Sequence, residues 1–168
     1  NGTTSTTLRS DGSPYPVTFP GFYQNGGLVN LDDDPQPEVV LLARSPWTVR
    51  AYDHDGTPLW SQSPGSGVTS SRTPTFCLGN FDGDDRAEVA FPKRTTMYGI
   101  DDDGTIAWSA ATDEASCCAG CSVFDFDADG IQEIVYRDED YLSIFDSTNG
   151  RVLWRTPVTH STGKELPA

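Results

Sequence analysis

The chain has 168 residues, and its 11 Lys and Arg stand against 25 Asp and Glu, which gives a formal net charge of −14. Nucleic acids and anionic membrane surfaces attract basic faces, so this charge argues against both as partners. The longest aliphatic run, residues 39–43, is far too short to cross a bilayer. We therefore expect a soluble protein with no nucleic-acid partner and no membrane insertion.

Residues 1–20 open the chain. The first fourteen are mostly small and polar, so we predict a linker here with no core of its own. The chain begins at Asn1 without Met, from which we expect a processed protein or a piece of a longer one.

Beyond the linker, one pattern repeats three times. An acidic loop, a hairpin loop and a final tryptophan recur in the same phase, and the tryptophans Trp60, Trp108 and Trp154 are 48 and 46 residues apart. Each unit has four β-branched or aromatic runs, which are too short for helices. The first run precedes the acidic loop (28–31, 75–81 and 122–126), and the second follows it (39–42, 89–91 and 134–136). The last two flank a hairpin whose glycine, Gly56, Gly104 or Gly150, can take a positive φ.

Four antiparallel strands in a unit of this length are typical of a propeller blade. We predict an all-β fold of three four-stranded antiparallel propeller-type blades, which is either a partial β-propeller or one that oligomerisation completes. The blades are expected at 21–62, 63–110 and 111–156, and 157–168 is expected to start a further blade or form a tail. The tryptophans share one phase, so we expect them to fill the gaps between blades rather than to stack on sugars.

The acidic loops carry oxygen side chains at positions 1, 3, 5 and 9 of nine residues. Carboxylates this crowded repel one another unless a cation lies among them, and calcium accepts about six to eight oxygen ligands in a tolerant geometry. We therefore predict Ca2+ as the cofactor, with the backbone carbonyl of position 7 as a further ligand. The predicted ligands are Asn30, Asp32, Asp34, Gln36 and Glu38; Asn80, Asp82, Asp84, Arg86 and Glu88; and Asp125, Asp127, Asp129, Ile131 and Glu133.

An EF-hand is the rival interpretation, but it needs its last acid at position 12 and a helix on each side. A solvated acidic turn without metal is the other alternative. Position 6 is Gly130 in loop three, Asp85, which tolerates a left-handed backbone, in loop two, and Pro35, which does not, in loop one. We expect calcium occupancy to fall in that order. The tetrapeptides 53–56 and 101–104 lie inside hairpins and lack the downstream acid, so we interpret them as turns.

The chain has four cysteines, Cys77, Cys117, Cys118 and Cys121. An even number in so acidic and lysine-poor a chain indicates an oxidising, extracytoplasmic compartment. We predict two disulfides, one of which joins Cys77 to one of the other three and links neighbouring blades. Zinc at Cys118 and Cys121 would need two more ligands, and no second C-x-x-C or H-x-x-x-H supplies them. Free buried thiols are the remaining alternative.

The motif Asp-x-Asp-x-Asp-Gly-x-x-Glu leads into a strand and is complete in residues 125–133. With this motif at blade spacing, residues 21–156 resemble the FG-GAP or VCBS-type repeats of the integrin α-subunit propeller and of secreted bacterial surface proteins and lyases. The resemblance implies calcium as a structural ion at the rim of the wheel, and a secreted or cell-surface protein. It implies no shared activity, because the same wheel carries adhesins, lectins and lyases.

Two functions are compatible with this sequence. We favour a non-catalytic, calcium-stabilised module for extracellular adhesion, recognition or assembly, with a protein or carbohydrate ligand that the sequence does not identify. The alternative is a fragment of a propeller-fold polysaccharide lyase, which needs a base and a cationic group. The available side chains are His54, Lys93, His160 and Lys164, and we expect His54 and Lys93 simply to face solvent.

Three blades leave two outer faces without a neighbouring blade. We expect either self-association, with a head-to-tail dimer as the leading form, or completion by further blades of a longer chain. An open monomeric arc whose ends are covered by residues 1–20 and 157–168 is the main alternative.

Overall fold

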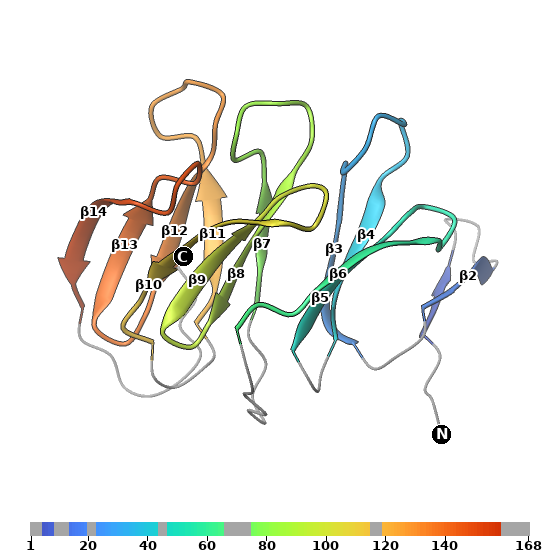
Figure 1. Ribbon diagram of the computed structural model, residues 1–168, viewed down its shortest axis with the longest axis horizontal. Coiled ribbons are helices and arrows are strands. Elements are labelled where there is room, and N and C mark those ends of the chain that lie inside the picture. Colours follow the sequence, from blue (N-terminus) through green and yellow to red (C-terminus); the bar gives the residue numbers. More distant parts are fainter. Residues whose placement is uncertain are drawn as a thin grey trace.

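The computed structural model describes residues 5–8, 14–19, 23–43, 47–65, 75–114 and 119–158. Three four-stranded antiparallel sheets stand side by side, and a two-stranded ribbon lies beyond the first (Figure 1). This confirms the predicted all-β fold of three propeller-type blades. No helix that could cross a membrane occurs among these residues.

Each blade is a simple meander in which every strand pairs with the next one along the chain. Blade one contains β3 (Tyr23–Val29), β4 (Glu38–Ala43), β5 (Thr48–Tyr52) and β6 (Pro58–Gln62). Blade two contains β7 (Cys77–Gly79), β8 (Glu88–Lys93), β9 (Thr96–Ile100) and β10 (Ile106–Ala111). Blade three contains β11 (Cys121–Phe124), β12 (Glu133–Arg137), β13 (Tyr141–Phe145) and β14 (Val152–Pro157).

The core lies between the blades. Alternate side chains of a strand face opposite sides of its sheet, so a blade between two others is buried on both faces. In β8 every residue is buried: Val89 and Phe91 pack toward blade one, and Ala90 packs toward blade three. The short β-branched and aromatic runs therefore become strands because each neighbouring blade covers one of their faces.

Two of the three repeated tryptophans fill the gap to the next blade, as predicted. The indole Nε1 of Trp60 donates to the Asp102 carbonyl at 2.6 Å, and that of Trp108 donates to the Ser147 carbonyl at 2.6 Å. Each ring lies against a hairpin glycine of the following blade, Gly104 or Gly150, both of which have positive φ. A Cβ at either glycine would overlap the ring, so the absence of a side chain is what allows the blades to approach.

Trp154 holds the same place in blade three but remains 49% exposed. It pairs with Ile144 just as Trp60 pairs with Ala51 and Trp108 with Gly99, so it projects from the corresponding face of its blade. Val152, Leu153 and Phe124 are also exposed on blade three.

The N-terminal segment differs from the predicted linker, because it contains β1 (Ser5–Leu8) paired with β2 (Pro14–Phe19). Phe19 at the end of β2 is buried and meets the Tyr52 ring edge-on, with centroids 5.0 Å apart. Val39 and Leu41 pack against this pair, so the ribbon covers part of the outer face of blade one. The buried aromatic ring of Phe19 therefore anchors the end of β2 on blade one.

A disulfide joins Cys77 on β7 to Cys121 on β11, with Cα atoms 5.7 Å apart. It links the first strands of blades two and three and confirms the predicted bridge between neighbouring blades. Cys117 and Cys118, which would form the second predicted disulfide, lie outside the described residues, as do His160 and Lys164.

Replacing both bridged cysteines by Ala should lower the free energy of unfolding by about 4 kcal/mol on the loop-closure account, because the disulfide spans 44 residues of chain. Urea denaturation of the Cys77→Ala/Cys121→Ala protein against the oxidised wild type measures this loss. The same comparison under a reducing agent should show almost no difference. Equal stability of the two oxidised proteins would contradict a stabilising role for the bridge.

Candidate metal centres

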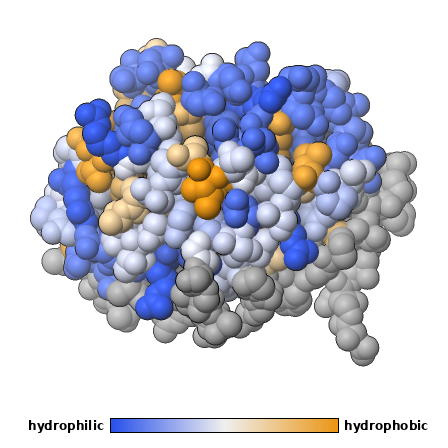
Figure 2. Space-filling view, in the orientation of Figure 1, coloured by the Kyte–Doolittle hydropathy of each residue, from blue (hydrophilic) through white to orange (hydrophobic). Residues whose placement is uncertain are grey.

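The acidic loops precede the second strand of each blade, and all of them lie at the same end of the array as the hairpin loops (Figure 1). This rim is largely hydrophilic on the face shown in Figure 2. Backbone hydrogen bonds join each loop to the next: Ala87 N–H donates to the Asn30 carbonyl at 2.8 Å, and Gln132 N–H to the Asn80 carbonyl at 2.9 Å. The loops therefore form one continuous row.

Within each loop, carboxylates accept hydrogen bonds from backbone N–H groups two residues further on. Asp82 accepts from Asp84 at 3.1 Å, and Asp84 accepts from Arg86 at 2.7 Å. These Asx-type contacts form the turn and explain why Asp recurs at alternate positions. Gly130 has the expected positive φ of 94°, but in loop two Gly83 rather than Asp85 is left-handed, which corrects our expectation for Asp85.

The glutamate at position 9 is buried in all three loops: Glu38 is 0%, Glu88 5% and Glu133 7% exposed. Its Oε2 accepts a hydrogen bond from the N–H of position 2, as in the 2.6 Å contact from Leu31 to Glu38 and the 2.8 Å contact from Phe126 to Glu133. The Oε1 atoms of Glu38 and Glu88 have no hydrogen-bond partner within the described part of the chain. A buried carboxylate oxygen left in this state is strongly destabilising unless a cation or proton meets it.

The fold brings carboxylates together in each blade, with ligand atoms of each group within 4.8 Å of one another. Blade three assembles Asp125, Asp127 and Glu133, all of which were predicted. Blade two assembles Asp82 and Glu88, which were predicted, with Asp101, which was not. In blade one the groups are Asp32, Glu38 and Asp53, and Asp34, Glu38 and His54.

Other predicted ligands have different contacts. Asn30 Nδ2 donates to the Asp85 carbonyl in the next loop, and Asn80 Nδ2 donates to the Asp84 carbonyl in its own. Asp84 and Asp129 belong to none of these groups among the described residues, and their Oδ1 atoms accept from the N–H of position 7. Positions 3 and 9 thus converge in each blade, whereas positions 1 and 5 converge only in part.

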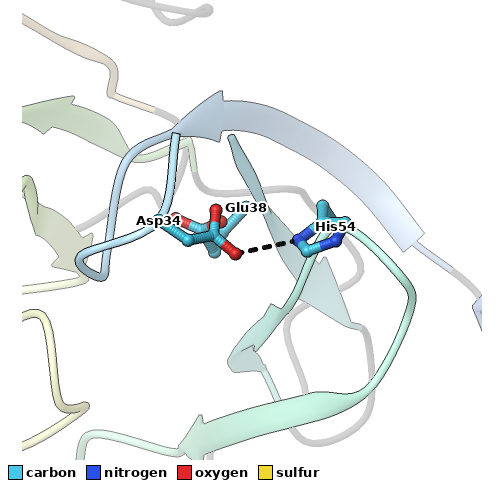
Figure 3. Close-up of side chains that lie close together, drawn as sticks. All are labelled: Asp34, Glu38 and His54. Atoms are coloured by element: carbon cyan, nitrogen blue, oxygen red, sulfur yellow. Dashed lines mark ion pairs between the residues drawn. The ribbon is translucent and has the colours of Figure 1, made fainter. Parts of the chain in front are cut away.

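The sequence interpretation missed the hairpin residues of blades one and two. In blade one, His54 comes from the β5–β6 hairpin and points at Asp34 of the acidic loop (Figure 3), with Nδ1 3.3 Å from Asp34 Oδ2 and 2.6 Å from Asp53 Oδ1. His54 was expected simply to face solvent but lies half-buried in this acidic group. The sequence signal for these extra residues was that Asp53 and Asp101 occupy the same place in successive repeats. An aspartate at this place also favours turn formation, so the signal did not by itself indicate a ligand.

Lys93, also expected to face solvent, is buried at the far end of β8. Its ammonium donates to the carbonyls of Pro64 at 2.6 Å and Gly65 at 3.1 Å, and burial lowers the pKa of this amine. The acidic loop lies before β8 and Lys93 ends it, so Lys93 and the metal-centre residues occupy opposite ends of the blade.

Burial and like charge raise the pKa of Glu88 to about 8, with Asp82, Asp84 and Asp101 as the neighbouring charges. Burial also raises the pKa of Glu38 and that of Asp101. In blades one and two the fold therefore gathers several carboxylates around one buried glutamate. Hard carboxylate oxygens around an unpartnered buried oxygen fit calcium chemically.

No protein-family model matches the chain, and no curated protein matches it. Among solved structures it is similar to the V. cholerae biofilm matrix protein Bap1, with a TM-score of 0.68 and 13% identity, over 96% of this chain and 53% of that one. BamB from Moraxella catarrhalis gives a TM-score of 0.53 and 18% identity, over 77% of this chain and 38% of that one. The chain thus spans only about half or less of either structure. At these identities the likeness establishes a shared β-rich fold and nothing more.

Proposed function

We propose that this chain is a non-catalytic, calcium-stabilised β-propeller repeat module of the FG-GAP or VCBS type, which serves adhesion, recognition or assembly outside the cytoplasm. The observation that carries the calcium role is the buried, unpartnered Oε1 of Glu38 and Glu88, each amid further carboxylates. A divalent cation would balance the charge of these buried oxygens, which would otherwise need a basic side chain beside them.

The loops explain how such an ion would act on the whole array. Each ion fixes one acidic loop, and each loop is hydrogen-bonded to its neighbour through Ala87 or Gln132. Arg86 adds a second link, since its guanidinium pairs with Asp33 of loop one at 2.9 Å and with Asp102 of blade two at 2.6 Å. Ordering one loop therefore orders the junction between two blades.

Three observations support the extracellular and assembly parts of the proposal. The Cys77–Cys121 disulfide suits an oxidising compartment. Strand alternation and pairing place the exposed side chains of Trp154 and Phe124 on the same outer face of blade three, and exposed aromatic side chains are typical of a contact surface. The similarity to a protein that occurs in a biofilm matrix agrees with an extracellular role.

Calcium at a hundredfold excess over its dissociation constant should stabilise the folded chain by about 2.7 kcal/mol per site. In a domain of this size that raises the melting temperature by roughly 5–10 °C. Thermal denaturation in calcium and in chelator, at matched ionic strength, measures the shift. Matching is essential because salt also screens the net charge of −14.

Asp127→Ala should remove the part of this gain that loop three contributes, because Asp127 lies with Asp125 and Glu133 in the blade-three group. Identical melting temperatures of the wild type in calcium and in chelator would refute the structural-ion role.

A further inference from the structure

In blades one and two the buried glutamate of the acidic loop meets an aspartate from the hairpin of the same blade. We propose that these hairpin aspartates, Asp53 and Asp101, are calcium ligands, so that each ion in blades one and two is held jointly by an acidic loop and a hairpin. This inference rests on the calcium role proposed above and adds two ligands outside the nine-residue loop.

Site two shows the arrangement most fully. Asp82, Glu88 and Asp101 line a cavity of about 230 Å³ between blades two and three, with Trp108 and Ser147 in its wall. Glu88 is only 5% exposed, and its Oε2 accepts from Phe81 N–H while its Oε1 has no partner among the described residues. No Lys, Arg or His in the described ranges forms an ion pair with any of the three carboxylates. A cation could therefore enter this cavity and balance the charge of the three carboxylates.

The hairpin does not need the Asp101 carboxylate to form its turn. The backbone closes the turn through Asp101 N–H to the Thr105 carbonyl and Gly104 N–H to the Asp101 carbonyl. Asp103 supplies the Asx contact by accepting from Thr105 N–H at 2.8 Å. In blade one Asp55 does the same for Thr57 at 2.8 Å. Asp53 Oδ1 accepts from His54 N–H at 2.6 Å and Asp101 Oδ1 accepts from Asp102 N–H at 3.2 Å, so each carboxylate has one contact within its own turn. Each also lies beside the buried glutamate of the acidic loop in its blade, and the turn alone does not require that second position.

Blade three provides an internal contrast. Asp146 opens the third hairpin, which is one residue longer, with its glycine at position 150. The Asp146 carboxylate accepts from the Thr148 hydroxyl at 2.6 Å and from Asn149 Nδ2 at 2.8 Å. It belongs to no metal-ligating group among the described residues, and Asp125, Asp127 and Glu133 converge without it. The same fold therefore contains two composite sites and one site made by the loop alone.

Site one differs from site two in one respect. His54 Nδ1 lies beside both Asp53 and Asp34, so an imidazole occupies part of the space that site two leaves open. Glu38 Oε1 nevertheless has no hydrogen-bond partner in the described part of blade one and is fully buried. The same pair of a buried Glu and a hairpin Asp thus occurs twice in independent blades.

Calorimetric titration of the whole chain with calcium tests the inference. Asp101→Asn and Asp53→Asn should each weaken one site by at least about tenfold, since a lost ligand costs no less than a lost outer-shell partner. Asp55→Asn and Asp85→Asn are matched controls in the same hairpin and loop, are exposed, and should bind as the wild type does.

A second measurement separates a ligand from a merely structural residue. In chelator, Asp101→Asn should raise the melting temperature, because the change removes the cost of burying a charged carboxylate and its repulsion from Asp82. A residue needed only for the turn would lower it.

The outcomes separate the two proposals. A wild type that binds no calcium refutes the proposed function. A wild type that binds calcium, with a site weakened by Asp82→Asn but unchanged by Asp101→Asn and Asp53→Asn, refutes the composite sites and leaves the proposed function standing.

Discussion

Glu88→Gln should stabilise the calcium-free protein at pH 9 and abolish the calcium response of blade two. The wild-type carboxyl has a pKa of about 8 in the folded state, chiefly because of burial and then because of Asp82, Asp84 and Asp101. Its ordinary value is 4.5. Between these two values the folded state holds a proton that the unfolded state has released. Ionisation therefore destabilises the wild type progressively as pH rises from about 5 to above 8.

The amide that replaces this carboxyl in the variant carries no charge, so the loss of stability at high pH disappears. In chelator the variant should melt at least about 4 °C above the wild type at pH 9, the shift that roughly 1–2 kcal/mol produces in a domain of this size. At pH 5 the two proteins should melt almost together. In calcium the order reverses, because only the wild type offers a carboxylate oxygen to the ion.

Differential scanning calorimetry at pH 5, 7 and 9, with calcium and with chelator, measures this reversal. Asp85→Asn is the matched control, because it removes one negative charge from the same loop at an exposed position. It should shift all six melting temperatures alike. A wild-type melting temperature in chelator that does not fall between pH 5 and pH 9 would contradict the prediction.

Trp108→Ala should lower the free energy of unfolding by about 3–5 kcal/mol, the usual cost of removing a large aromatic side chain from a core. The ring fills the space between Gly99 of its own blade and Gly150 of the next, and its N–H donates to the Ser147 carbonyl. Truncation leaves a cavity between two blades and a carbonyl without its donor. Urea denaturation at low protein concentration measures the loss.

Trp154→Ala is the paired control, because Trp154 occupies the same phase of the repeat but is 49% exposed. It should change the free energy of unfolding by less than about 1 kcal/mol. Its effect should appear in assembly instead: the wild-type mass from light scattering should rise with concentration, and the variant's should rise less. Equal losses of stability at the two positions would contradict a stabilising role for Trp108 alone. A wild-type mass that is constant at all concentrations would contradict a role for Trp154 in assembly.

The ribbon of β1 and β2 bears on the form of that assembly. A head-to-tail dimer needs blade three of one copy to meet the outer face of blade one of another. Phe19 already covers Tyr52, Val39 and Leu41 on that face. The ribbon therefore favours the open-arc alternative at the blade-one end, while the Trp154 face of blade three is the exposed end.

The sequence predicted the features that repeat, because repetition makes a weak local signal visible three times. Blade number, strand order, the loop carboxylates at positions 3 and 9 and the inter-blade disulfide all follow from phase and spacing. The N-terminal ribbon was missed because it carries neither an acidic loop nor a terminal tryptophan. Yet Asp11-Gly12-Ser13-Pro14 parallels Asp55-Gly56-Thr57-Pro58, and the Leu8–Pro14 pairing parallels that of Tyr52 with Pro58.

The hairpin ligands could not be separated from ordinary turn residues in one dimension. Asp101 and Asp103 cannot be told apart from the sequence pattern. Only the fold shows that Asp101, which accepts a hydrogen bond within its turn as Asp103 does, also lies beside Glu88. Lys93 was misplaced for a related reason, since its burial depends on carbonyls almost thirty residues away, at Pro64 and Gly65.

The burial of every residue in β8 has a consequence for how the molecule opens. In an array where each blade touches only its neighbours, the stability of a blade is the sum of its intrinsic folding free energy and the free energies of its contacts on either side. Among the described residues, blade two has a full blade on each side, whereas blade three has one and blade one has one blade and a ribbon. Local opening therefore proceeds inward from the ends, and blade two, held also by the disulfide, is the last unit to lose its structure.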